Sequence, residues 1–168
     1  MNFILDYIEA TTFWSILFIC HALMAVAVLG ALTHQAASVL APVRQGAGAT
    51  GFVVRFRAVQ GSAYATAVCV LWIVTFLFGA WIYTKYRTDI RGTIEEMGFW
   101  KTQGFFELKE HLASIGLGLL PAYWYFWKNA RDARFDSVRK WLTVTLAGMC
   151  WVMFLVGHVV NNTRGFAS

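Results

Sequence analysis

The sequence predicts an all-α integral membrane protein, an up-and-down bundle of four transmembrane helices, and three observations lead to that prediction. Of the 168 residues, 58% are hydrophobic and only 14% are charged, whereas a soluble domain carries about 25% charged residues. Four apolar stretches are each long enough to cross a hydrocarbon core, which takes about 20 helical residues. Basic residues gather in two of the connecting loops, as they do on one side of a polytopic membrane protein. We expect a single membrane domain over residues 1–168.

The first apolar stretch, roughly residues 13–40, is interpreted as a membrane span and not as a cleaved signal peptide. It is longer than the apolar region of a signal peptide, and Asp6 and Glu9 precede it where a signal peptide carries positive charge. In lipid every backbone N–H and C=O group must pair within the segment, which selects a helix. We expect this helix to remain in the mature protein.

The second and fourth stretches, roughly residues 62–83 and 141–160, meet the same length requirement. Each contains one cysteine, Cys69 and Cys150, and Cys20 lies in the first stretch. Because no C-x-x-C pair is present, we interpret all three cysteines as small buried hydrophobic residues. The C-x-x-C-H pattern that attaches c-type haem is also missing from the sequence.

The third stretch, roughly residues 105–127, begins with a charged segment, Glu-Leu-Lys-Glu-His at 107–111, and is then almost wholly apolar. Charges at the end of a span mark the water interface, and glutamates near a helix N-terminus interact favourably with the helix dipole. The preceding segment, residues 84–104, mixes charged residues with Ile90, Ile94 and Phe99. We expect an amphipathic segment there, lying on the outer surface.

The distribution of Lys and Arg predicts the orientation of the bundle. One side carries eight basic and two acidic residues, the bases being Arg44, Arg55, Arg57, Lys128, Arg131, Arg134, Arg139 and Lys140. The other side carries six basic and seven acidic residues. We therefore expect both termini outside, in the periplasm if the protein lies in a bacterial inner membrane.

All four histidines fall within the predicted spans, where ionisable residues are costly and often functional. His21 lies roughly 12 Å and His111 roughly 9 Å from the outer edge, at a rise of about 1.5 Å per residue. His158 comes near the outer end of the fourth span. These three histidines are therefore expected at a similar depth, whereas His34 lies near the opposite surface. His34 is either an interfacial histidine or a ligand at that inner side.

One interpretation of the three outer histidines is a b-type haem held by two of them, because imidazole is a common axial ligand and bundle cores place cofactors between helices. We expect His111 together with His21 or His158 as ligands. Gly118 lies on nearly the same face as His111, two turns deeper, where a glycine leaves a flat slot for a macrocycle. Basic residues of the outer side are candidates to pair with the haem propionates: Lys85, Arg87, Arg91, Lys101, Lys109 and Arg164.

A second interpretation is a copper or zinc site formed by His21, His111 and His158. Glu107 lies four residues before His111, on the same helical face, and could supply a fourth ligand or orient the imidazole. Lys109 would then extend to the surface.

A third interpretation assigns no cofactor. Each histidine would form hydrogen bonds between helices, and the chain would be a non-catalytic accessory subunit of a larger membrane complex. The haem interpretation instead predicts an electron-transfer subunit of an oxidoreductase complex. Its partners would be the lipid bilayer, other membrane or periplasmic redox subunits and a quinone. The basic residues flank apolar spans and form no polar face, which argues against nucleic acid as a partner.

The arrangement of His21, His111 and His158 in four apolar spans with aromatic and basic rims resembles that of membrane b-type cytochromes in general. This resemblance implies a four-helix architecture and a haem b. It departs from the two-haem pattern, because three histidines gather at one side and only His34 lies at the other. The stretch "HALMAVAVLG" from His21 to Gly30 is also similar to copper-resistance membrane proteins.

Overall fold

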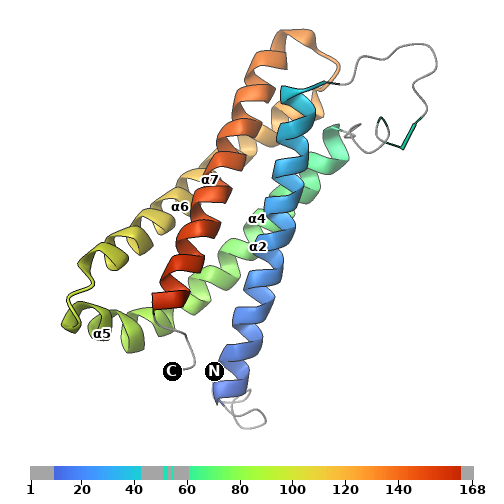
Figure 1. Cartoon of the computed structure of the whole chain (residues 1–168). Helices are drawn as coiled ribbons and strands as arrows, with labels where there is room; N and C mark the ends of the chain where they lie inside the picture. The colour runs from blue at the N-terminus through green and yellow to red at the C-terminus, as the bar shows by residue number, and fades with distance from the viewer. Residues whose placement is uncertain (1–9, 43–50, 53, 55–60, 164–168) are drawn as a thin grey trace.

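The computed structural model describes residues 10–42, 51–52, 54 and 61–163 (Figure 1). Its four long helices are α2 (Ala10–Leu40), α4 (Gly61–Lys85), α6 (Trp100–Lys128) and α7 (Asp136–Thr163). Each of the four predicted apolar stretches falls within one of these helices, so the predicted all-α class is confirmed. The basic residues of the first loop, Arg44, Arg55 and Arg57, lie outside the described residues.

The segment between α4 and α6 is largely helical and, as the sequence predicts, amphipathic. It contains a π-helical turn, η1 (Tyr86–Ile90), and the short helix α5 (Arg91–Glu96). Tyr86, Ile90 and Ile94 are buried while the intervening positions 87–89 are exposed, so the segment is amphipathic. A 3-10 turn, η2 (Ala133–Phe135), connects α6 to α7.

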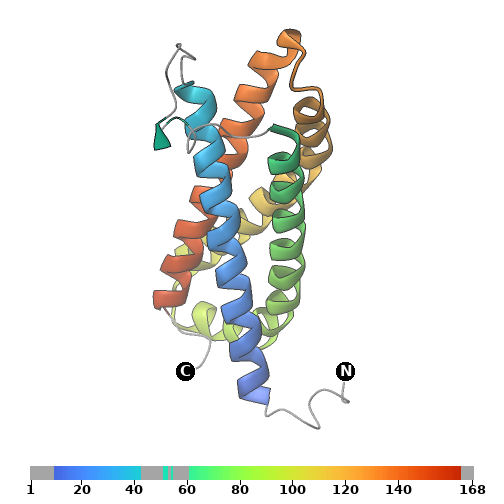
Figure 2. The same cartoon turned by 90° about the vertical axis from the view of Figure 1, so that its right-hand side faces the viewer.

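The four long helices form a closed ring of contacts in which each helix packs on two others. Helix α2 contacts α4 and α7, and α6 contacts the same two helices from the other side (Figure 2). The start of α2, the end of α7 and α5 all lie at one end of the molecule, here named the α5 end (Figure 1). The end of α2, the start of α4 and η2 lie at the opposite end, named the η2 end.

Three helical segments are long and apolar enough to cross a membrane: Thr11–Leu40, Gly61–Glu96 and Ala133–Asn161. Helix α6 has the required length but is not among them. Glu107, Lys109 and Glu110 lie in its first half and lower its apolar character. By length and composition, the predicted set of four spans is therefore supported for three helices.

The interior is divided into two clusters of buried residues. The larger cluster extends toward the η2 end and includes Leu32, Val68, Tyr123 and Leu146, one residue from each long helix. The helices approach closely there, because the indole ring of Trp72 occupies the space where a side chain on Gly116 would lie. The smaller cluster lies at the α5 end and consists of Tyr86, Ile90, Ile94, Phe106 and Val160.

Candidate functional site

A cavity of about 560 Å³ lies between the four long helices, where the two clusters meet. Its volume is within the range of about 300–1,000 Å³ that small-molecule sites occupy. Its wall is mostly apolar and contains four histidine, lysine or glutamate side chains, from α2, α6 and α7. These four residues are His21, Lys109, Glu110 and His158.

His21 enters the cavity from α2 with a defined hydrogen bond. Its Nδ1 lies 3.1 Å from the backbone carbonyl oxygen of Thr75 on α4. A carbonyl oxygen only accepts hydrogen bonds, so Nδ1 must carry the proton. In the neutral imidazole this assigns the lone pair to Nε2. A backbone carbonyl that accepts from one ring nitrogen is also the usual partner of a metal-ligating histidine.

Gly79 on α4 provides the space for this imidazole. A Cβ placed on Gly79 would lie 3.1 Å from Cε1 of His21, closer than ordinary van der Waals contact. Thr75 and Gly79 are four residues apart and therefore lie on the same face of α4. One turn of α4 thus provides both the hydrogen-bond acceptor and the clearance for His21.

His158 on α7 is the second histidine of the cavity wall. Its side chain is exposed at the rim, whereas His21 is half-buried. Gly157, the residue before it, also lines the cavity and faces Lys109 of α6. The structure therefore brings together two of the three predicted outer histidines, on the neighbouring helices α2 and α7.

Lys109 and Glu110 contribute the charges of the cavity from α6. Lys109 Nζ lies 3.6 Å from the position that a Cβ on Gly157 would take, and 5.4 Å from the ring centroid of Phe106. The expectation that Lys109 extends to the surface is therefore not met. Glu110 is half-buried and lines the same cavity.

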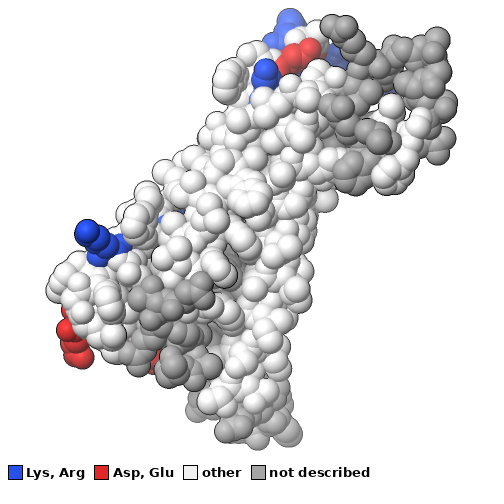
Figure 3. Space-filling view, viewed as in Figure 1, with Lys and Arg blue, Asp and Glu red and all other residues white. Residues whose placement is uncertain are grey.

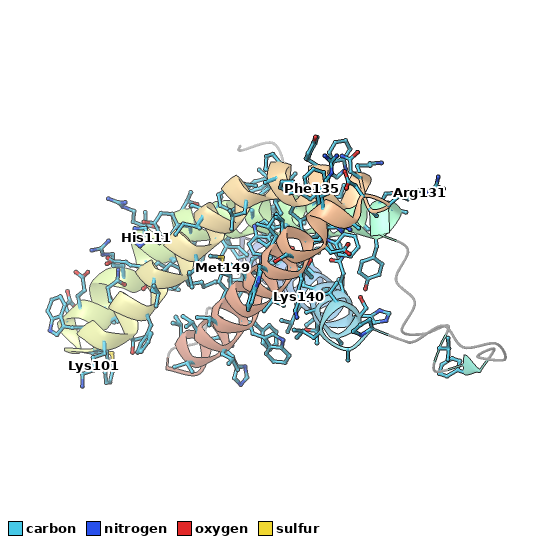
Figure 4. All side chains as sticks on the ribbon, turned by 90° about the horizontal axis from the view of Figure 1, so that it is seen from above. Lys101, His111, Arg131, Phe135, Lys140 and Met149 are labelled. Carbon is cyan, nitrogen blue, oxygen red and sulfur yellow. The ribbon has the colours of Figure 1, made fainter. Side chains whose placement is uncertain are left out.

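His111 is separated from the other two histidines of the predicted trio. It is exposed, does not line the cavity, and lies on the side of α6 that faces away from α7 (Figure 4). Gly118 is exposed as well, and a Cβ placed on it would meet no atom within 4 Å. The glycine that makes room beside a cavity histidine is Gly79 and not Gly118.

Glu107 and the two predicted arginines belong to a polar group at the α5 end. Arg91 Nε is 2.7 Å from an oxygen of Glu95, and Arg91 Nη2 is 3.6 Å from an oxygen of Glu107. Gln103 donates to Glu107 across 3.0 Å and accepts a hydrogen bond from the hydroxyl of the buried Tyr86. Arg87 is exposed, with Nη1 3.3 Å from the Tyr83 hydroxyl. None of these three predicted residues lines the cavity.

The predicted metal ligands do not come together in the described part of the chain. Among those residues, no group of three or more His, Cys, Asp or Glu side chains is placed to hold a metal ion. His34 lies toward the η2 end, where its Nδ1 is 3.2 Å from the Tyr64 hydroxyl. That hydroxyl is also 3.1 Å from the carbonyl oxygen of Ala31.

Sequence reasoning named Lys109 as a candidate partner of a haem propionate but missed Glu110, Thr75 and Gly79 as residues of the site, although all four lie in a helical pattern. The lining positions recur at helical spacing on three helices: 72, 75, 76, 79, 80 and 83 on α4, 106, 109, 110, 113 and 114 on α6, and 150, 153, 154, 157, 158 and 161 on α7. Position 111 falls outside that stripe. Small residues within it, such as Gly79, Ala80, Ala113 and Gly157, were the available signal.

Comparison with family models, curated proteins and solved structures found no match to this chain in any of the three.

Proposed function

We propose that the chain is an integral membrane redox subunit that binds one haem b in the cavity and passes electrons to or from a quinone or partner subunits. The observation that carries the proposal is the hydrogen bond from His21 Nδ1 to the Thr75 carbonyl, 3.1 Å long. It leaves Nε2 as a lone-pair donor in an apolar cavity. A second histidine, His158, lines the same cavity.

The surface supports a position in the bilayer. Charged side chains gather at the two ends of the molecule, and an uncharged band lies between them (Figure 3). Large apolar side chains are exposed along α2, α4 and α7, including Ile16, Leu23, Leu77, Leu155 and Val159. Such a continuous apolar surface would cause aggregation in water but suits lipid. In this proposal α6 is the fourth span, with its charged first half at the membrane surface.

The orientation follows from the charges at the η2 end. Lys128, Arg131, Arg134, Arg139 and Lys140 are all near that end. Asp132 pairs with Arg134 there, and these hydrogen bonds lower the pKa of the Asp132 carboxyl. The excess of positive charge favours an inner, cytoplasmic position for the η2 end. Both ends of the chain and the haem site are then on the outer, periplasmic side.

The residues of the cavity fit a haem b in three respects. His21 would hold the iron through Nε2, and His158 would offer a second imidazole from the neighbouring helix α7. The wall between them is mostly apolar, which suits a porphyrin face. Lys109 places a positive charge in a cavity whose ligand would carry carboxylates. His111 is not among the proposed ligands, because it faces away from the cavity.

A copper or zinc site is less well supported than haem. A metal ion bound without a porphyrin requires three or four protein ligands. The cavity supplies His21, His158 and Glu110, and the described residues contain no cluster of three such groups at metal-binding distance. Two axial histidines are sufficient for haem, because the porphyrin provides the other four donor atoms.

Haem would supply one-electron transfer, and the chain's own residues would hold it and exclude water from it. All described elements belong to the ring of four helices or connect its members. A donor and an acceptor must therefore come from other molecules, for which partner membrane or periplasmic subunits and a quinone are suited. We assign no catalytic reaction to the chain by itself.

The test is an absorption spectrum of the full chain purified in detergent from cells supplied with haem, recorded oxidised and then reduced with dithionite. The expected result is a sharp reduced α-band and a shifted Soret band. A flat visible spectrum would reject the haem proposal and leave an accessory subunit or, if metal analysis is positive, a metal-binding protein.

The ligand assignment is tested separately with His158→Ala, and His111→Ala serves as the matched control. Loss of the second imidazole should convert a six-coordinate low-spin haem into a high-spin one, seen by absorption and electron paramagnetic resonance. His111→Ala should leave the spectrum unchanged. The reverse pattern would mean that α6, not α7, supplies the second ligand.

A further inference from the structure

Lys109 stands out in the cavity because no carboxylate of the described residues lies within ion-pair distance of it. In the described part of the chain its ammonium group forms no ion pair with a carboxylate. Its contacts at the cavity wall are the Phe106 ring, with Nζ 5.4 Å from the centroid, and the space beside Gly157. A charge held against apolar surface is costly unless an anion accompanies it.

The glutamates near Lys109 do not form an ion pair with its ammonium group. Glu107 is turned toward Arg91 and Gln103. Glu110 lines the same cavity and attracts Lys109, but only from beyond ion-pair distance. The histidines of the wall, His21 and His158, add no negative charge. The cavity around Lys109 is therefore suited to an anion brought by the ligand.

Five other basic residues of this side were predicted to pair with propionates, and the four that the structure describes do not line the cavity. Lys85 is bonded to Asp89 across 2.8 Å, and Arg91 is bonded to Glu95 across 2.7 Å. Arg87 and Lys101 are exposed and do not line the cavity. Arg164 lies outside the described residues.

We propose that Lys109 binds a carboxylate of the cavity ligand, which is a haem propionate if the proposed function is correct. Gly157 is part of this site, because a side chain there would occupy the space that Lys109 Nζ faces. Glu110 on the same wall adds specificity, because a second carboxylate placed beside it would be repelled. The cavity should therefore bind a porphyrin with one free carboxylate far better than a fully esterified porphyrin.

The test uses the full chain, expressed without haem and titrated in detergent with haemin and, separately, with haemin dimethyl ester. An ion pair or charged hydrogen bond is worth about 1.5–3 kcal/mol, which corresponds to about 10- to 100-fold in affinity. The wild-type chain should bind haemin about 10- to 100-fold more tightly than its dimethyl ester. Lys109→Met should lose that preference, whereas Lys109→Arg and the exposed control Lys101→Met should keep it.

The possible outcomes separate this inference from the proposed function. If the wild-type chain binds neither porphyrin, both are rejected. If it binds haemin and the ester equally, or if Lys109→Met keeps the preference, haem binding stands and the role of Lys109 is rejected. The wild-type comparison alone decides the matter if Lys109→Met does not fold. A lower midpoint potential of the haem in Lys109→Met than in Lys101→Met would be a second supporting result. Removal of a nearby positive charge favours the oxidised form of the haem.

Discussion

The α5 end and the η2 end each contain a histidine whose Nδ1 is engaged, but of the two only His21 lines the cavity between the helices. His21 contacts the Thr75 carbonyl across 3.1 Å, and His34 contacts the Tyr64 hydroxyl across 3.2 Å. The difference lies in the neighbouring residues. Beside His21, Gly79 leaves room for the imidazole ring, and Gly157 leaves room for Lys109 in the same cavity, whereas the interior toward the η2 end is filled by large side chains such as Leu32 and Tyr123.

The polar groups of the two ends differ in the same way. Toward the η2 end several of them pair: the Tyr123 hydroxyl donates to Gln35, whose buried Nε2 has no partner among the described residues, and Trp127 Nε1 donates to Thr143 across 3.0 Å. At the cavity, no such pairs between helices join Lys109, Glu110 and His158 within the described part of the chain. Buried polar groups that satisfy one another strengthen a fold, whereas groups left open toward a cavity are available to a ligand. The comparison thus distinguishes a structural polar cluster from a candidate binding site within one chain.

Removing each histidine is the strongest way to test this comparison. His21→Ala should abolish haem binding, because it removes the only Nε2 donor fixed by a backbone carbonyl within the described cavity wall. His34→Ala should leave the haem content unchanged, because His34 does not line the cavity. The measurement is the haem-to-protein ratio after purification. Equal loss in both variants would show that the histidines act through the fold and not as ligands.

Substitution of Gly79 should have an intermediate effect on haem binding, smaller than that of removing His21. Gly79→Ala places a methyl group 3.1 Å from His21 Cε1, so the imidazole must move. We expect a lower affinity for haemin, about tenfold, and an altered Soret position. Gly118→Ala is the matched control, because a Cβ there meets nothing within 4 Å and alanine favours the helix by about 1 kcal/mol.

The readouts are a haemin titration and a thermal melt of each variant. Gly118→Ala should bind haemin like the wild-type chain and melt at the same or a higher temperature. If the two variants bind haemin alike, Gly79 does not position His21.

The helices could be predicted from the sequence, because about 20 consecutive apolar residues leave few alternatives in a membrane. The depth of the histidines could also be estimated, since it follows from the rise per residue. The rotation of each helix about its axis could not. It depends on which faces pack together, and an apolar exterior removes the polar-versus-apolar contrast that reveals the inner face of a helix in a soluble protein.

The misplacement of His111 illustrates this limit. His111 and Lys109 are two residues apart and therefore point in nearly opposite directions from α6. A lysine is usually assigned to the surface and an intramembrane histidine to the interior, but the structure has the reverse arrangement. Gly79 faces His21 and Gly157 faces Lys109, so these small residues mark the inward-facing sides of α4 and α7 in the structure. Their meaning becomes clear only when the facing helix is known.

The smallest effect on haem binding is expected from a change in the polar cluster toward the η2 end, which contains Tyr123 and Gln35. Tyr123→Phe removes the hydroxyl that donates to Gln35, a residue with no exposed surface. An unsatisfied buried acceptor costs about 1–3 kcal/mol, so the variant should unfold at a lower temperature or denaturant concentration. Its haemin affinity and spectrum should match those of the wild-type chain, because neither residue lines the cavity. Tyr125→Phe, on the exposed side of the same helix, is the control and should change neither property. A spectral change in Tyr123→Phe would show that the two ends are coupled through the helices, and the division between structural cluster and binding site would then be wrong.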